Sequence, residues 1–269
     1  MIRYLLFFSL FFIAGSCTRN AVTGRNQLQL LPESEVQSMA SQQYKQFLTE
    51  NKVVSSTVNK DAEMVRRIGQ RLTKAIGDYY TQQGKGNILD GYQWEYNLVD
   101  SKDVNAWCMP GGKIVVYTGL LPISQNEAAL AVVMGHEITH ALAQHGNERM
   151  SMGLVQQLGG VALSVAVANK PAETQSLFMN AYGVGSQVGV MLPFSRKDEY
   201  EADRFGLTFA ALAGYNPQEA IPLWERMQKA AGSNKPPEFL STHPSEGNRI
   251  DRLKELMPEA LKNYRPMGK

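Results

Sequence analysis

The chain has 269 residues, of which 43% are hydrophobic and 19% charged. It is therefore too apolar for an intrinsically disordered protein and long enough for one large domain or two small ones. The chain has 27 Lys and Arg residues and 25 Asp and Glu residues, so its net charge is only +2. No run of basic residues is present that could neutralise the phosphates of a nucleic-acid backbone. We therefore expect no nucleic-acid partner. Two cysteines also exclude a small scaffold held together by disulfides.

The first residues predict a signal peptide. Arg3 precedes an apolar run, Leu5–Ala14, which is about half of the roughly 20 residues that a membrane-spanning helix requires. The small residues that follow the run end at Cys17 and resemble the lipobox of bacterial lipoproteins. This resemblance implies cleavage after Ser16 and a lipid on Cys17. An ordinary cleaved signal and an uncleaved anchor are the alternatives.

These features divide the chain into a signal peptide (1–16), a lipid-anchored tether (17–32) and one main domain (33–269). Thr18 follows the cysteine, and a residue other than Asp there resembles the sorting signal for the outer membrane of Gram-negative bacteria. We therefore expect a bacterial envelope protein that its N-terminal lipid attaches to the outer membrane, facing the periplasm. Cys108 is then left unpaired and is most simply a buried core residue.

Beyond the tether, the hydrophobic pattern predicts a mainly helical chain that a small sheet interrupts. Helical patterns cover 33–49 and 61–76, and the second places four apolar residues on one face, Met64, Ile68, Leu72 and Ile76. Residues 92–98 alternate between apolar and polar and predict a half-buried strand. A turn at 110–112 and a β-branched run at 114–117 predict a second strand. The expected fold class is α+β, mainly helical.

A long helix-compatible stretch, 125–149, contains the motif HExxH from His136 to His140. Four residues advance a helix by about one turn, so the two histidines project from one face and can bind the same cation. Zinc is suited to two neutral imidazoles and a carboxylate. A carboxylate beside an open coordination position, here Glu137, can accept the proton of a bound water. HExxH also occurs in proteins without metal, so the site needs a third ligand from elsewhere.

His145 is the nearest further histidine. In the metzincin pattern a glycine and a histidine follow the second motif histidine at three and six residues, whereas this chain has Ala143 and Gly146 there. On a continuous helix His145 lies about 140° around the axis from His140. It can join the same site only if the helix breaks. We therefore expect His145 on the solvent side or in ordinary packing.

A better third ligand lies in a second helical pattern, which begins near Ser195 and stops at Gly214. Glu199 and Asp203 are four residues apart, so both can face the first helix. Glu199 can supply the third ligand, while Asp203 can accept a hydrogen bond from the outer nitrogen of a liganding histidine. Glu201 lies between them and is expected to point away.

With these motifs in place, the chain resembles the M48 family of zinc metallopeptidases, the gluzincin group that includes periplasmic lipoprotein proteases. The resemblance runs from about Val22 to Arg252. The motifs that carry it are HEITHALAQH at 136–145, EYEAD at 199–203, STHP at 241–244, VTGR at 22–25, and Asn105-Ala106 followed by a Pro-Gly-Gly turn. It implies a zincin-like metallopeptidase domain over 33–269, with HExxH on the active-site helix and one zinc ion per chain.

The resemblance also implies the chemistry. His136, His140 and Glu199 match the zinc ligands, and Glu137 matches the base that activates a zinc-bound water for hydrolysis of a peptide bond. His243 is a candidate to stabilise the charge on the tetrahedral oxygen, and by resemblance it could instead occupy the fourth zinc position in a resting form. A third alternative is that His243 caps the turn before a helix expected at 245–257. Arg249 is a weaker candidate for charge stabilisation.

Substrates are expected to be proteins or peptides that add a strand to the sheet edge at Asn105 and Ala106. Trp107 and Met109 are candidates for the walls of side-chain pockets, or for the core. By analogy with the family alone, the substrates are misfolded envelope proteins. The most apolar internal stretch, Gly153–Ala168, is expected to form a buried or lid helix pair. Two alternatives stay open: a non-enzymatic zinc-stabilised lipoprotein that assists outer-membrane protein assembly, and a latent protease covered by the insertion at 153–190.

Overall fold

The computed structural model describes residues 17–153, 155, 192–232, 237, 239–240, 243 and 247–266. The expected signal peptide lies outside the described residues, as does nearly all of the insertion at 153–190 with the helix pair expected at 153–168. The described part is mainly helical with small sheets, so the predicted fold class is confirmed.

Six helices of more than one or two turns build the described body. They are α2 (Glu33–Glu50), α3 (Lys60–Gln82), α5 (Glu127–Leu142), α8 (Leu192–Leu212), α9 (Ala220–Ala231) and α11 (Arg249–Lys262). Shorter turns complete it: η1 (Gly86–Leu89), η2 (Thr118–Leu120), α4 (Leu121–Ser124) and η4 (Pro217–Glu219). The helix expected at 245–257 thus begins at Arg249, where its first turn is described. Of the described helices, none combines the length and the apolarity needed to cross a membrane.

The main sheet has four strands in the order β3-β4-β6-β5. Their bounds are β3 (Val53–Val54), β4 (Glu95–Val99), β5 (Ala106–Met109) and β6 (Lys113–Tyr117). β4 pairs with β6 in parallel, and β5 pairs with β6 in an antiparallel hairpin around the predicted turn. Gly111 and Gly112 in that turn have φ of 81° and 85°, which favours glycine. β5 therefore forms one edge of the sheet.

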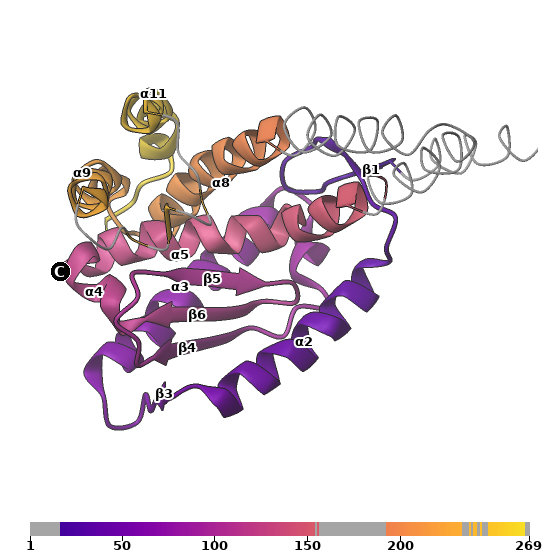
Figure 1. Ribbon diagram of the computed structural model, residues 1–269. Coiled ribbons are helices and arrows are strands. Elements are labelled where there is room, and N and C mark those ends of the chain that lie inside the picture. Colours follow the sequence, from indigo (N-terminus) through magenta and orange to yellow (C-terminus); the bar gives the residue numbers. More distant parts are fainter. Residues whose placement is uncertain are drawn as a thin grey trace, which may run out of the picture.

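The two faces of this sheet bury separate sets of apolar side chains. Ile114 and Val116 of β6 pack with the predicted face of α3, where Ile68, Leu72 and Ile76 are fully buried. Val115, between them, packs on the opposite face with Tyr44 of α2. Figure 1 shows α2 and α3 on opposite sides of the sheet and α5 alongside β5. This alternation is the two-residue period of a β-strand that is covered on both faces.

Two glycines allow α5 and α8 to cross at very short range. A Cβ on Gly135 would lie 2.8 Å from the Gly206 carbonyl oxygen, and a Cβ on Gly206 would lie 2.8 Å from the His136 amide nitrogen. Any side chain at either position would force the helices apart, because its neighbours are backbone atoms. The sequence analysis places HExxH and Glu199 on these two helices, so the glycine pair sets the distance between the two motifs.

The segment expected to be a tether is packed against the main body. It forms a two-stranded hairpin of β1 (Cys17–Arg19) and β2 (Asn26–Leu28). Asn20 Nδ2 donates to the Leu142 carbonyl at 3.0 Å and Gln27 Nε2 to the Ala143 carbonyl at 2.7 Å. The hairpin thus satisfies carbonyl groups that the end of α5 leaves without helical partners.

The helix expected over 125–149 is therefore interrupted. α5 ends at Leu142, and Gln144 adopts a φ of 56° before the chain becomes helical again at His145. Tyr92 adds a third cap, since its hydroxyl donates to the Ala141 carbonyl at 3.0 Å. The break redirects His145, which decides where that side chain lies.

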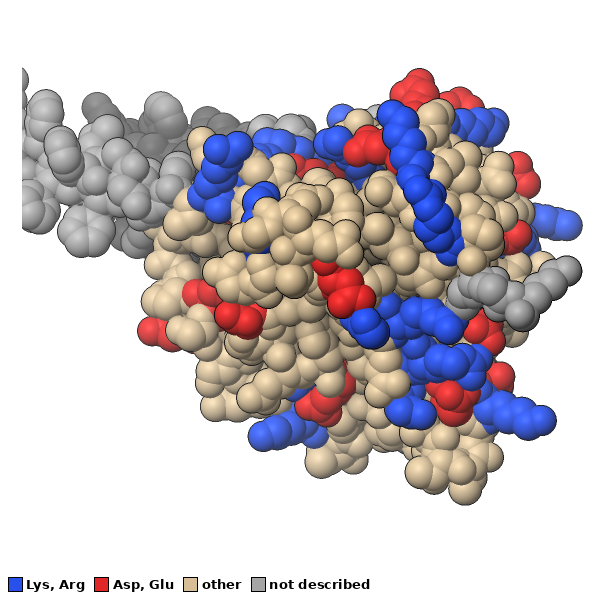
Figure 2. All heavy atoms as spheres, turned by 180° about the vertical axis from the view of Figure 1, so that it is seen from behind, with Lys and Arg blue, Asp and Glu red and all other residues tan. Residues whose placement is uncertain are grey.

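The surface carries mixed charge. On the face shown in Figure 2, Lys and Arg side chains lie beside Asp and Glu side chains. Arg204, for example, pairs with Glu259 at 2.9 Å, and both side chains are more than 40% exposed. Such exposed pairs contribute little to stability.

Candidate metal centre

Four buried side chains converge between α5, α8 and the chain before α11: His136, His140, Glu199 and His243. Their ligand atoms all lie within 4.8 Å of one another. His136 Nε2 is 3.1 Å from His140 Nε2 and 3.3 Å from His243 Nδ1. The sequence prediction that α5 and α8 bring two histidines and Glu199 together is thus matched by the geometry, with His243 beside them.

The donor set fits zinc. Tetrahedral ligands that bind zinc at 2.0–2.1 Å are about 3.3 Å apart. Glu199 Oε1 lies 3.3 Å from His140 Nε2, and Glu199 Oε2 lies 3.3 Å from His136 Nε2. Glu199 Oε2 is buried and has no hydrogen-bond partner among the described atoms. Three facing imidazole nitrogens and an unpaired carboxylate oxygen therefore form a cage that a divalent cation would satisfy.

The electrostatics of the cluster also favour a cation. Burial opposes charge on both imidazoles of α5 and holds the pKa of His140 well below its ordinary value. For His136, the neighbouring Glu199 and Asp203 outweigh burial and raise the pKa to about 9. Despite its burial, the histidines lower the pKa of Glu199. The site thus stabilises a positive charge, because His136 holds a proton there more tightly than a histidine in water does.

Glu137 faces the same cluster from α5. It is 2% exposed, and its Oε1 is 3.4 Å from His243 Nε2 without an accepted hydrogen bond. Burial raises the pKa of this carboxyl group. Glu137 is therefore an acceptor of unusual basicity beside the cage and is not itself one of the four grouped ligands.

Asp203 and Arg249 support the outer side of His136. Asp203 Oδ1 is 3.1 Å from His136 Nδ1, and Arg249 donates to both Asp203 oxygens at 2.6 and 2.8 Å. The guanidinium of Arg249 is fully buried and lies 3.6 Å from the centre of the Trp224 ring. Arg249 is the weaker of the two sequence candidates for stabilising reaction charge, and its shortest contacts are to Asp203. The contact to Glu199, at 3.4 Å, is longer.

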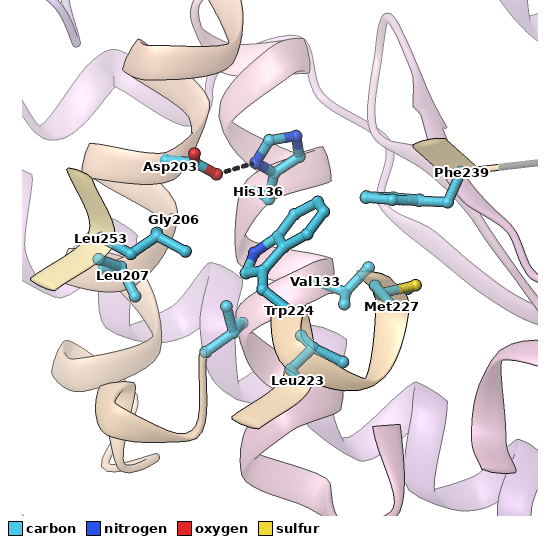
Figure 3. A pocket seen from close by; sticks show the side chains of 11 residues that line it. Val133, His136, Asp203, Gly206, Leu207, Leu223, Trp224, Met227, Phe239 and Leu253 are labelled. Atoms are coloured by element: carbon cyan, nitrogen blue, oxygen red, sulfur yellow. Dashed lines mark hydrogen bonds and ion pairs between the residues drawn. The ribbon is translucent and has the colours of Figure 1, made fainter. Parts of the chain in front are cut away.

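Figure 3 shows this outer side, with Asp203 pointing at His136, Trp224 beneath the ring and Phe239 to one side. Phe239 stacks on the His243 ring with centroids 4.5 Å apart. The cavity among these residues has a volume of about 10 Å³. That is near the lower limit for one water molecule, so a peptide must approach the cluster from another side.

The expectation of His145 on the solvent side is wrong, whereas Glu201 points away from the four grouped ligands as expected. His145 is fully buried, and its Nδ1 is 2.9 Å from Nδ1 of His140, because the break in α5 turns it back toward the cluster. Glu201 does point away from the four grouped ligands, but its Oε2 is 3.1 Å from His145 Nε2. The two side chains are thus hydrogen-bonded to each other beside the cluster.

Arg25 is a residue of this centre that the sequence analysis did not single out. Its Nε donates to Glu201 at 2.7 Å, and its two Nη atoms each donate to Glu148 at 2.6 Å. A third carboxylate, Asp198, is 3.5 Å away. The available signal was the VTGR motif, which carries the family resemblance but gives no partner for the arginine.

The edge strand β5 packs alongside α5. Asn105 and Ala106 are both buried, and Asn105 Oδ1 accepts the Ala106 amide at 2.9 Å. Trp107 and Met109 instead pack on the other face of the sheet against α2, so they belong to the core and do not face the cluster. Cys108 has no disulfide partner among the described residues and packs at the margin of the main core.

Comparison with known proteins is consistent with this geometry. A model described as peptidase family M48 matches residues 60–257. The Bos taurus mitochondrial metalloendopeptidase OMA1 is 34% identical over 249 residues, which cover 90% of this chain and 46% of that protein. The Arabidopsis thaliana mitochondrial metalloendopeptidase OMA1 is 39% identical over 179 residues, 66% of this chain and 35% of that protein. The Escherichia coli beta-barrel assembly-enhancing protease is 28% identical over 234 residues, 73% of this chain and 46% of that protein. This chain spans between about a third and a half of the length of these relatives.

Proposed function

Because this chain belongs to peptidase family M48, we propose that it is a zinc-dependent endopeptidase whose metal is held by His136, His140 and Glu199. The observation that carries the proposal is the convergence of these donors with the unpaired Oε1 of Glu137 in one buried site. When bound, zinc supplies a water of lowered pKa and polarises the scissile carbonyl group.

Glu137 then acts as the general base. Its Oε1 is positioned beside the cage without a hydrogen bond of its own, so it can accept a proton from the attacking water. Burial raises the pKa of Glu137, which increases its proton affinity and lets it hold the proton for the departing amine. Asp203, held by Arg249, keeps His136 oriented with Nε2 toward the cage.

His243 fills the fourth corner of the cage. Its Nδ1 is 3.0 Å from Glu199 Oε1 and 3.3 Å from His136 Nε2, distances that match those between tetrahedral zinc ligands. We propose that this arrangement is a resting form, in which His243 occupies the position that water and substrate need. After it is displaced, the same imidazole is available to stabilise charge on the tetrahedral oxygen. His243→Ala should then raise basal hydrolysis if blocking dominates and lower it if stabilisation dominates.

The substrate would add to β5. The Tyr117 amide donates to the Asn105 carbonyl at 3.1 Å, so antiparallel alternation directs the backbone groups of Ala106 and Cys108 toward the outer edge. An extended peptide paired there would run alongside α5, which carries HExxH. The Ala106 amide already donates to Asn105, so the Ala106 carbonyl and the Cys108 backbone are the groups offered. Asn105→Ala should raise KM without changing zinc content.

Glu137→Gln is the decisive test, with Glu127→Gln as the matched control. Both glutamates lie on α5, but Glu127 is 41% exposed and pairs with Arg67. Glu137→Gln should keep one zinc per chain and lose about 10²–10⁴-fold in casein hydrolysis. Glu127→Gln should keep both properties. Unchanged hydrolysis in Glu137→Gln would refute the assignment. If both the wild type and His243→Ala bound zinc and neither hydrolysed casein, the non-enzymatic alternative would be favoured.

We also propose a physiological role in the bacterial envelope. The lipobox resemblance at Cys17 supports a lipoprotein of the bacterial envelope, with the domain over 33–269 facing the periplasm. One relative is named for enhancing beta-barrel assembly, which supports misfolded envelope or outer-membrane proteins as substrates. Cys17→Ser should abolish palmitate labelling, and a labelled mutant would refute the lipoprotein assignment.

A further inference from the structure

His140 has an outer support that differs from that of His136. Its Nδ1 faces Nδ1 of His145 at 2.9 Å, and the other nitrogen of His145 faces Glu201 at 3.1 Å. Glu201 in turn accepts from Arg25 at 2.7 Å, and Arg25 holds Glu148 through two hydrogen bonds of 2.6 Å. His145 is fully buried, and Glu201 and Arg25 expose only 13% and 11% of their side chains. These contacts form one continuous series of hydrogen bonds, the His140–Arg25 hydrogen-bond series, from the cage to the N-terminal hairpin.

The donor and the acceptor of each hydrogen bond in this series follow from the number of hydrogens that a neutral imidazole carries. Two imidazole nitrogens at 2.9 Å can share one hydrogen, so one donates and the other accepts. His140 presents Nε2 to the cage, so a neutral His140 carries its hydrogen on Nδ1 and donates to His145. His145 then carries its own hydrogen on Nε2 and donates to the Glu201 carboxylate. Each ring nitrogen of His140 and His145 then makes one contact, as a donor or as an acceptor.

We propose that His145, Glu201 and Arg25 are positioning residues that fix the tautomer and ring orientation of His140. The proposal rests on the metal being held by His140, as proposed above. His136 contacts Asp203 directly, whereas His140 reaches Glu201 through His145, so each imidazole of α5 is connected through a carboxylate to a buried or nearly buried arginine. The N-terminal hairpin, which precedes the family match at residue 60, thereby becomes part of the metal centre.

The same side chains have a second possible use that the geometry disfavours. His145, Asp198 and Glu201 offer atoms close enough to hold a second cation. However, the Arg25 guanidinium already bonds Glu201 at 2.7 Å and lies 3.5 Å from Asp198. His145 Nε2 has no lone pair for a metal while it donates to Glu201. A wild-type protein with two tightly bound zinc ions would overturn the His140–Arg25 hydrogen-bond series.

The test compares two replacements of His145. His145→Phe keeps a ring and removes the acceptor, while His145→Asn keeps an acceptor near the position of Nδ1. Zinc affinity is measured by chelator competition, and the thermal midpoint of the metal-free protein reports on folding. Glu201→Gln is tested beside Glu259→Gln, whose glutamate pairs with Arg204 at the surface. Histidine ring ¹H–¹⁵N spectra of the zinc-loaded wild type report the tautomers.

We expect His145→Phe to weaken zinc binding about 10 to 100-fold, and His145→Asn to recover most of that loss. Glu201→Gln should also weaken binding, and Glu259→Gln should not. The spectra should show hydrogen on Nδ1 of His140 and on Nε2 of His145.

Unchanged zinc affinity in His145→Phe would overturn the proposal. So would an equal loss in both His145 variants that follows the thermal midpoint of the metal-free protein, since the role would then be structural. His140→Ala separates this result from failure of the site itself, because zinc retained in that variant would refute the metal assignment.

Discussion

The glycine pair at the crossing of α5 and α8 predicts a variant that damages the metal site more than the fold. In Gly206→Ala, the added Cβ would lie 2.8 Å from the His136 amide nitrogen, 2.9 Å from its Cα and 3.1 Å from the Gly135 carbonyl carbon. Favourable contacts between heavy atoms are about 3.5–4.0 Å apart. Since all three neighbours are backbone atoms, the helices must separate by about 1 Å.

Two opposing effects decide the loss of stability. Overpacking of this kind costs about 1–3 kcal/mol, while replacing a mid-helix glycine by alanine returns about 1 kcal/mol of helix propensity. The free energy of unfolding should therefore fall by about 0–2 kcal/mol. The metal site is less tolerant, because ligand distances are held to about 0.2 Å and a 1 Å displacement can cost about 10²-fold. Glu199 and Asp203 would move with α8 while His136 and His140 stay on α5.

The assay is zinc dissociation by chelator competition together with thermal unfolding of the metal-free protein. Gly77→Ala is the matched control, because it also lies within a helix and its Cβ would meet only the end of the Leu89 side chain, at 3.3 Å. We expect Gly77→Ala to bind zinc like the wild type and Gly206→Ala to bind it about 10²-fold more weakly. Wild-type zinc affinity in Gly206→Ala would refute the argument that this crossing sets the ligand geometry.

Two further predictions concern carboxylates and caps. Zinc affinity should be highest in the wild type, about 10 to 100-fold weaker in Asp203→Asn, and weakest in Glu199→Gln. The reason is that Glu199 would bind zinc directly, whereas Asp203 acts through His136. The reverse order of the two variants would show that their roles are exchanged. Asn20→Ala should lower the free energy of unfolding by about 1–3 kcal/mol, because it leaves the buried Leu142 carbonyl unpaired. Asn51→Ala removes a similar bond to a helix-end carbonyl at an exposed position and should have little effect, and equal losses in urea unfolding would contradict the role of burial.

The parts of the site that lie within single helices were predictable. His136 and His140 share a face by the period of α5, and Glu199 and Asp203 share one by the period of α8. Each relation needs only helix geometry over four residues. The pairing of the two helices was predictable from the chemistry, because two histidines leave a zinc site incomplete.

His145 shows where such reasoning ends. The stretch from 125 to 149 has no proline and reads as one helix, and on one helix the exclusion of His145 is correct. The chain breaks at Gln144 because Asn20, Gln27 and Tyr92 cap the carbonyl groups of the last turn. Asn20 and Gln27 lie more than 110 residues away in sequence. No local propensity could place them there, so tertiary contacts override the helical pattern.

The charges buried around the cage explain why it is suited to a divalent cation. Glu137, Glu199 and Asp203 are each no more than 6% exposed, and of the described cationic side chains Arg249 alone is both fully buried and bonded to this set. With neutral histidines, three carboxylates and one guanidinium leave two negative charges in a region of low dielectric. A proton on His136, whose pKa is raised to about 9, compensates only one of them. A zinc ion compensates both, so the same desolvation that makes two uncompensated negative charges costly strengthens the preference of the cluster for a doubly charged metal.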